Sequence, residues 1–193
     1  MSVSWGAACR PKEGQSVSGD VFVVEPFDAS GLQVAVIDGL GGGIEAAHAA
    51  EGAATVIRAR LDSEPLDLIR LAHTALHNTR GAVIGILTFD LLHRSVTYVG
   101  VGNIGAQVYS SQSIKPISKN GILGYRLPHL LKMTYAYNFG DTFVLYSDGI
   151  SSRFGLDTHV NHNQPPQMFA DLILSRYGKM NDDATVVVVR ISE

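Results

Sequence analysis

The chain has 193 residues, of which 46% are hydrophobic and 17% charged, and its formal net charge at pH 7 is −3. This length and composition predict one globular domain, residues 1–193, with a substantial buried core. The 15 Lys and Arg residues are dispersed, which argues against a nucleic-acid-binding surface. The single cysteine, Cys9, excludes an intrachain disulfide and a cysteine-rich zinc site, and we expect it to be a small buried hydrophobe.

The first residues lack the basic segment and apolar stretch of an export signal. No apolar run approaches the roughly 20 residues that a membrane-spanning helix needs. Together with the single cysteine, these features lead us to expect a soluble cytoplasmic protein that is not exported.

Hydrophobic periodicity in the first half of the chain predicts strands followed by two helices. Strands are expected at residues 3–9, 20–26 and 32–37, with consecutive ones close enough to be antiparallel neighbours. An Ala-rich helix is expected over 44–61, and a second one, beginning at a proline, over 65–79.

The second half returns to the period of strands. Gly140-Asp141 predicts a hairpin that joins 133–139 to 142–146. Residues 118–131 contain Gly and Pro with little periodicity, so we expect a long surface loop there. The elements expected, in order, are strands at 82–89, 95–101, 106–109, 133–139 and 142–146, a helix over 165–177, and a strand over 184–191.

The order of these elements indicates the fold class. Strands, two helices, a run of antiparallel strands, a helix and a final strand are typical of an α+β fold, not of a doubly wound parallel sheet. This many strands suits two mainly antiparallel sheets flanked by helices. We therefore predict a four-layer α-β-β-α sandwich.

Aspartates stand at the ends of several expected strands. Asp38 directly follows an apolar segment and precedes a glycine-rich turn, where the backbone carbonyl of Gly39 could also approach a bound ion. Any one Asp-Gly pair is more often a simple turn, so the interpretation depends on the combination. The same placement at a strand end is shared by Asp20, Asp148, Asp182 and Asp183.

If folding brings these carboxylates together, the repulsion between their negative charges must be offset. Two like charges about 4 Å apart repel by roughly 4 kcal/mol at an effective dielectric near 20, and several such pairs would exceed the stability of a typical domain. Protonation or divalent cations must relieve this repulsion. All-oxygen ligands suit Mg²⁺ or Mn²⁺ better than zinc, and two such ions can hold a phosphoryl group for ester hydrolysis.

The aspartate motifs resemble those of a known family. Together and in this order they are similar to the metal-binding motifs of the PPM, or PP2C-type, Ser/Thr phosphatases, over nearly the whole chain. The closing segment, residues 182–190, is similar to that of the bacterial SpoIIE-like branch. The motifs are Gly19-Asp20, Asp38-Gly39-Leu40-Gly41, Ser147-Asp148-Gly149 and Asp182-Asp183-Ala184-Thr185.

The resemblance implies a β-sandwich flanked by helices and a centre of two Mn²⁺ or Mg²⁺ ions. Asp38 would bridge the ions and hold the water that attacks phosphorus in line. Asp20 and the Gly39 carbonyl would complete the first ion site. The second site would be completed by Asp148 and Asp182, with Asp183 the less favoured member of its pair.

The resemblance also suggests substrates. Eukaryotic members hold the substrate phosphate with an N-terminal arginine, for which Arg10 is the candidate here. Arg126, in the expected 118–131 loop, is a second candidate. The bare length resembles the feedback phosphatases of stressosomes, which implies that the partners are phosphorylated STAS-domain proteins.

Two other functions are compatible with parts of the sequence. Residues 41–46 match the dinucleotide-binding pattern G-x-G-x-x-A, and Asp62 follows about 20 residues later. That fingerprint needs a parallel strand after its first helix, whereas a second helix is expected here. The domain could instead be a non-catalytic PP2C-fold binding module in a signalling complex, although the four acidic ligand positions argue against a dead site.

Overall fold

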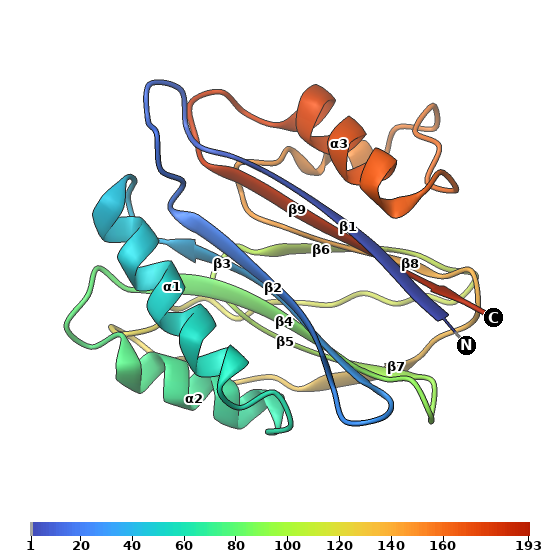
Figure 1. The fold of residues 1–193 in the computed structure, drawn as a ribbon, viewed down its shortest axis with the longest axis horizontal. Helices are drawn as coiled ribbons and strands as arrows, with labels where there is room; N and C mark the ends of the chain where they lie inside the picture. Colours follow the sequence, from blue (N-terminus) through green and yellow to red (C-terminus); the bar gives the residue numbers. More distant parts are fainter. Residues whose placement is uncertain (1) are drawn as a thin grey trace.

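The computed structural model describes residues 2–193 and contains two antiparallel sheets that face each other, with helices on their outer faces (Figure 1). This confirms the predicted α+β sandwich. One sheet has the strand order β2 (Asp20–Phe27), β3 (Gly31–Gly39), β4 (Ala82–Asp90), β5 (Ser95–Val101) and β7 (Met133–Ala136). The other has the order β1 (Ser2–Arg10), β9 (Ala184–Ser192), β8 (Thr142–Tyr146) and β6 (Gly105–Tyr109). The helices are α1 (Ile44–Arg58), α2 (Pro65–Ala75), the short 3₁₀ helix η1 (Ser152–Gly155) and α3 (Pro166–Tyr177).

Alternation along β3 explains the layers. Val34 and Val36 pack into the core between the two sheets, whereas Ala35 and Ile37 pack against α1 and α2. The small side chains along α1 let this helix approach the sheet closely, since its alanines facing the core are fully buried. On the other side of the sandwich, α3 packs against β1 and β9.

Two strand-pairing predictions were wrong. β1 pairs with β9 and not with its sequence neighbour β2. β7 pairs with β5, while β8 pairs with β6 and β9, so Gly140-Asp141 carries the chain from one sheet to the other and forms no hairpin. The Asp141 carboxylate accepts hydrogen bonds from the Asn138 amide and the Ser110 hydroxyl, which stabilises this crossing. A hairpin within one sheet and a crossing between two sheets both show two apolar segments joined by a short turn, so the sequence does not distinguish them.

Other local expectations need correction. The 118–131 segment is not simply a surface loop, because Leu123 is fully buried and bonds to the backbone of Ala82. Cys9 is exposed rather than buried, and the Thr185 hydroxyl donates a hydrogen bond to its sulfur over 3.1 Å. No helix within residues 2–193 is long and apolar enough to cross a membrane.

The fold excludes the dinucleotide-binding interpretation. The helix that follows the glycine-rich turn, α1, leads into a second helix, and the next strand, β4, is antiparallel to β3. The Rossmann fingerprint depends on a parallel strand at that position. The glycines therefore do not form a dinucleotide-binding turn.

Candidate metal centre

Asp20 and Asp38 lie directly opposite each other in the antiparallel pair of β2 and β3. Two positions along each strand, Phe22 and Val36 contact the core between the sheets. Because side chains alternate between the two faces of a strand, both carboxylates also belong to the face that meets the other sheet. They lie where this core opens at one end of the sandwich.

Ser147 connects Asp20 to the opposite sheet. Its hydroxyl donates a 2.6 Å hydrogen bond to Asp20 Oδ2 and accepts one of 2.9 Å from the backbone amide of Thr185, in β9. The other oxygen, Asp20 Oδ1, is buried and has no hydrogen-bond partner within residues 2–193. A buried carboxylate oxygen without a partner is costly, and a cation is one way to satisfy it.

Asp148 follows β8 and is oriented by two residues that the sequence analysis did not single out. Asn103 Nδ2 donates a 2.7 Å hydrogen bond to Asp148 Oδ2, and Lys179 Nζ donates one of 2.6 Å to the Asp148 backbone carbonyl. Asn103 sits in a turn whose sequence carries no functional signal. Only the folded chain brings these residues together.

The neighbouring aspartates Asp182 and Asp183 differ in their surroundings. Asp183 is buried, and its two oxygens accept hydrogen bonds from the backbone amides of Lys12, at 2.8 Å, and Gly19, at 2.9 Å. It thus anchors the segment between β1 and β2. Asp182 is only partly exposed, and its Oδ1 accepts one hydrogen bond, from the Asp183 amide. Asp182 consequently keeps more free ligand capacity than Asp183.

The surroundings of the aspartates disfavour the ionised form of their carboxyl groups, so their pKa values are raised. Burial raises the pKa of Asp38 to about 8, and the carboxylates of Asp20 and Asp148 add to this. Burial likewise raises the pKa of Asp20 to about 7, although the hydrogen bond from Ser147 acts in the opposite direction. The pKa of Asp148 is also raised, first by burial and then by Asp182.

The aspartates affect one another's pKa values, but their side chains do not surround a common point as the ligands of a bound ion do. Within the part of the chain that the structure describes, no three Asp, Glu, His or Cys side chains converge closely enough to enclose an ion. Their mutual effects on pKa act over longer distances than direct ligation does. The donor set is all oxygen, which fits hard divalent cations, and a bound cation would remove the charge repulsion. The residues present therefore fit the metal that the motifs imply.

The glycines of both Asp-Gly pairs permit close backbone contacts. A Cβ atom on Gly39 would lie 1.9 Å from the backbone oxygen of Ala46, and one on Gly149 would lie 1.8 Å from that of Asp183. No other residue fits at these points without a backbone shift. Gly39 thus places Asp38 against the start of α1, and Gly149 places Asp148 against the segment that carries Asp183.

The candidate arginines lie in different settings. Arg10 Nη2 donates to the Lys179 carbonyl over 3.0 Å, which ties its guanidinium to the chain after α3. Arg126 is exposed and lines a groove of about 410 Å³ together with Asn103, the partner of Asp148. The sequence analysis missed Arg80, whose Nη1 lies 2.8 Å from where a Cβ on Gly41 would stand. Arg126 thus shares a groove with the hydrogen-bond partner of Asp148, and Arg80 approaches the glycine-rich turn that follows Asp38.

This sandwich, with aspartates from both sheets gathered at one end, defines a PP2C-type Ser/Thr phosphatase domain. The chain belongs to the stage II sporulation protein E (SpoIIE) family, whose model matches residues 28–192. The SpoIIE protein of Bacillus subtilis (strain 168) is 26% identical over 215 residues, which cover 98% of this chain. The chain spans only 26% of the length of that relative.

Solved structures agree with this family. One, from work on the bacterial stressosome as a modular system adapted to control secondary messenger signalling, has a TM-score of 0.92 and 33% identity, covering 98% of this chain and all of its own. RsbX in complex with magnesium has a TM-score of 0.88 and 25% identity, with 98% of this chain and 96% of RsbX covered. The phosphatase domain of B. subtilis SpoIIE with a regulatory fragment has a TM-score of 0.82 and 26% identity, with 99% and 63% covered.

Proposed function

We propose that this domain hydrolyses phosphoserine or phosphothreonine on partner signalling proteins, with two Mg²⁺ or Mn²⁺ ions as cofactors. The observation that carries the proposal is the opposed, largely buried pair Asp20 and Asp38, whose raised pKa values mark a site that lacks compensating positive charge. The similar RsbX structure holds magnesium, which supports a divalent cation here. The domain would act as one unit over residues 1–193.

Each acidic residue has a proposed place at the ions. Asp38 would be shared by both ions, with Asp20 and the Gly39 carbonyl on the first. Asp148 and Asp182 would hold the second. When bound, such an ion pair supplies an activated water as nucleophile and neutralises charge on the phosphoryl oxygens.

The surrounding residues would orient these ligands. The hydrogen bond from Ser147 holds Asp20 in one rotamer and leaves Asp20 Oδ1 free for a cation. Asn103 likewise holds the Asp148 side chain in place, because it donates a hydrogen bond to Asp148 Oδ2 and leaves Oδ1 for a cation. Such outer partners fix ligand geometry and commonly affect metal affinity by about 10- to 100-fold.

The substrate is proposed to be a phosphorylated STAS-domain component of a stressosome, in an RsbX-like feedback role. The similarity to RsbX and to a structure from stressosome work supports this choice. The candidates for binding a phosphoryl oxygen are Arg126, which shares a groove with Asn103, and Arg80, which approaches the turn after Asp38. Arg10 is the weaker candidate, because it already donates to the Lys179 carbonyl.

The test is phosphate release from a panel of phosphorylated STAS-domain proteins, each incubated with the purified domain and Mn²⁺ or Mg²⁺. We expect turnover of at least one substrate, and its loss on chelation. Equal turnover after thorough chelation would disprove the metal mechanism. Tight binding of a phosphorylated partner without any phosphate release would instead favour the non-catalytic binding module.

A further inference from the structure

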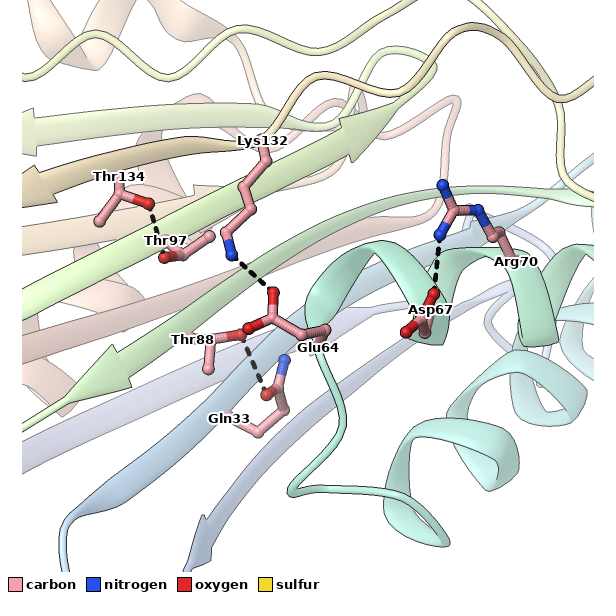
Figure 2. Close-up of polar contacts among 8 residues, drawn as sticks. All are labelled: Gln33, Glu64, Asp67, Arg70, Thr88, Thr97, Lys132 and Thr134. Atoms are coloured by element: carbon pink, nitrogen blue, oxygen red, sulfur yellow. Dashed lines mark hydrogen bonds and ion pairs between the residues drawn. The ribbon is translucent and has the colours of Figure 1, made fainter.

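A row of polar side chains crosses the five-stranded sheet on the face that α1 and α2 cover. Gln33, Thr88, Thr97 and Thr134 are successive register partners in β3, β4, β5 and β7 (Figure 2). The Thr88 hydroxyl donates to Gln33 Oε1 over 3.1 Å, and the hydroxyls of Thr97 and Thr134 are 3.0 Å apart. Further along the same face of β3, the side chains are apolar. The row marks the place where the apolar core ends.

Gln33 is the unusual member of this row. Its side chain is fully buried, at 0% exposure, and its Nε2 has no hydrogen-bond partner within residues 2–193. In Figure 2 the amide end of this side chain points toward Glu64 at the start of α2. The Thr88 hydroxyl can donate or accept, so the amide can turn over and present either its oxygen or its nitrogen. In both orientations one polar atom of this buried amide has no partner among the described residues, which costs about 1–3 kcal/mol.

A cavity of about 320 Å³ lies next to this row. Thr88 and Thr97 line it from the sheet, and Ser63 and Glu64 line it from the connection between α1 and α2. Its volume falls in the range of small-molecule sites. Along β2, the turn beside the cavity is seven residues from Asp20, which places the two sites roughly 24 Å apart at about 3.4 Å per residue.

The rim of the cavity is mainly acidic. One cation, Lys132, is present there, and its Nζ lies 2.6 Å from Glu64 Oε2 (Figure 2). Both side chains of this pair are exposed, at 38% and 62%, so the pair contributes little to stability and can be displaced. The carboxylates of the rim are Asp28, Asp62, Glu64 and Asp90. The two oxygens of Asp90 already contact the His93 backbone amide, at 2.9 Å, and ring, at 2.7 Å, so Asp28, Asp62 and Glu64 are the rim carboxylates for a ligand.

We propose that this cavity binds a guanidinium group, supplied by a free small molecule or by an arginine side chain of a partner protein. The planar guanidinium has five N–H donors, which match rim carboxylates and the hydroxyl oxygens of Thr88 and Thr97. Gln33 does not line the cavity itself, but its buried amide lies behind Thr88 and its end points toward Glu64, and both of these residues line the cavity. Lys132 occupies part of the site in the free protein and competes with the ligand. This site is separate from the proposed phosphatase centre.

The experiment is a titration of the metal-chelated full chain with agmatine, followed by calorimetry and by NMR shifts of the Gln33 and Thr97 amides. Chelation removes any contribution from the metal centre. We expect saturable binding that Glu64→Gln weakens by about tenfold, the size expected for one charge-assisted hydrogen bond. Lys132→Ala should strengthen binding severalfold, because the competing cation is gone.

Asp67→Asn is the matched control. Asp67 is also a carboxylate near the start of α2, but it pairs with Arg70 at 2.7 Å and does not line the cavity (Figure 2). Agmatine affinity should be unchanged in this variant. An equal loss in Asp67→Asn and Glu64→Gln would mean diffuse attraction of a cation and would overturn the proposal.

A second pair of titrations distinguishes the sources of the guanidinium. A hexapeptide with one arginine is compared with the same peptide carrying citrulline, which keeps the shape and lacks the charge. Stronger binding of the arginine peptide than of agmatine indicates a protein partner, and the reverse indicates a free small molecule. If neither probe shifts the Gln33 and Thr97 amides, or citrulline binds as well as arginine, the site does not bind a guanidinium.

Discussion

Asp20 and Asp38 face each other across β2 and β3, and Ser147 from the opposite sheet donates its hydroxyl hydrogen to Asp20. Like charges directly opposite in an antiparallel pair destabilise a sheet. Here both groups are also largely buried, so their pKa values rise to about 7 and about 8. The metal-free protein therefore carries a cost at neutral pH that a divalent cation would remove.

The first prediction concerns pH and stability without metal. Because the folded pKa values of Asp20 and Asp38 lie above the ordinary value of 3.8, the folded state binds more protons than the unfolded state between that value and about 8. The free energy of unfolding in EDTA should therefore fall as the pH rises through this window. Each pKa unit corresponds to about 1.4 kcal/mol, shared between the two coupled groups.

Urea unfolding at several pH values, with EDTA and with Mg²⁺, measures this effect. Mg²⁺ should flatten the decline, since a bound cation stabilises the ionised carboxylates. In Asp38→Asn the decline should be smaller even in EDTA. A chelated wild-type protein whose stability rises from pH 5 to pH 8 would contradict the prediction.

The second prediction concerns Asp38→Asn and activity. The substitution removes the ligand proposed to be shared by both ions, so phosphate release from a phosphoprotein should fall below detection. Stability in EDTA at pH 8 should not fall, because a neutral amide replaces a carboxylate whose charge is unfavourable there. Circular dichroism monitors the fold. Full activity in this variant would remove Asp38 from the mechanism.

The third prediction concerns Ser147→Ala. The variant leaves Asp20 Oδ2 without its 2.6 Å hydrogen bond in a buried setting, which should lower the free energy of unfolding by about 1–3 kcal/mol. The pKa of Asp20 should rise further, because that hydrogen bond lowers it. Calorimetric titration should show weaker Mg²⁺ binding. Ser151→Ala is the control for Mg²⁺ affinity, since Ser151 also follows β8 but its hydroxyl oxygen accepts from the Arg153 amide at the start of η1 and has no hydrogen bond to these aspartates within residues 2–193.

The fourth prediction concerns Asn103→Ala. Asp148 then loses the side chain that orients its Oδ2, and metal affinity should fall by about 10- to 100-fold. Because Asn103 is exposed, stability in EDTA should change little. Unchanged Mg²⁺ affinity would show that Asn103 does not position Asp148.

The fifth prediction separates the two neighbouring aspartates. Asp183→Asn places an amide against the Lys12 and Gly19 amide donors, so one donor loses its acceptor and stability should fall by about 1–3 kcal/mol. Asp182→Asn should leave stability nearly unchanged but weaken Mg²⁺ binding. The opposite assignment of the two effects would make Asp183 the metal ligand.

The sequence alone was sufficient for the strands and the three α-helices, and it was enough to select the candidate ligands. Apolar periodicity placed β2, β3 and β4 within two residues of their observed ends, since alternation along a buried strand is a local property. The Asp-Gly pairs were equally visible, because a charge at the end of an apolar segment is a local contrast. The Asp-Gly steps at Asp38 and Asp148 recur for a physical reason, which is the close backbone contact behind each glycine.

Only the tertiary structure decided which strands pair and which side chains meet. The sequence around Gly140-Asp141 suits a hairpin, but β7 pairs in one sheet and β8 in the other, and local patterns do not carry that information. The contacts of Ser147 with Asp20 and of Asn103 with Asp148 span 127 and 45 residues. Serine and asparagine are common in turns, so their roles arise only when folding brings the two sheets together at the aspartates.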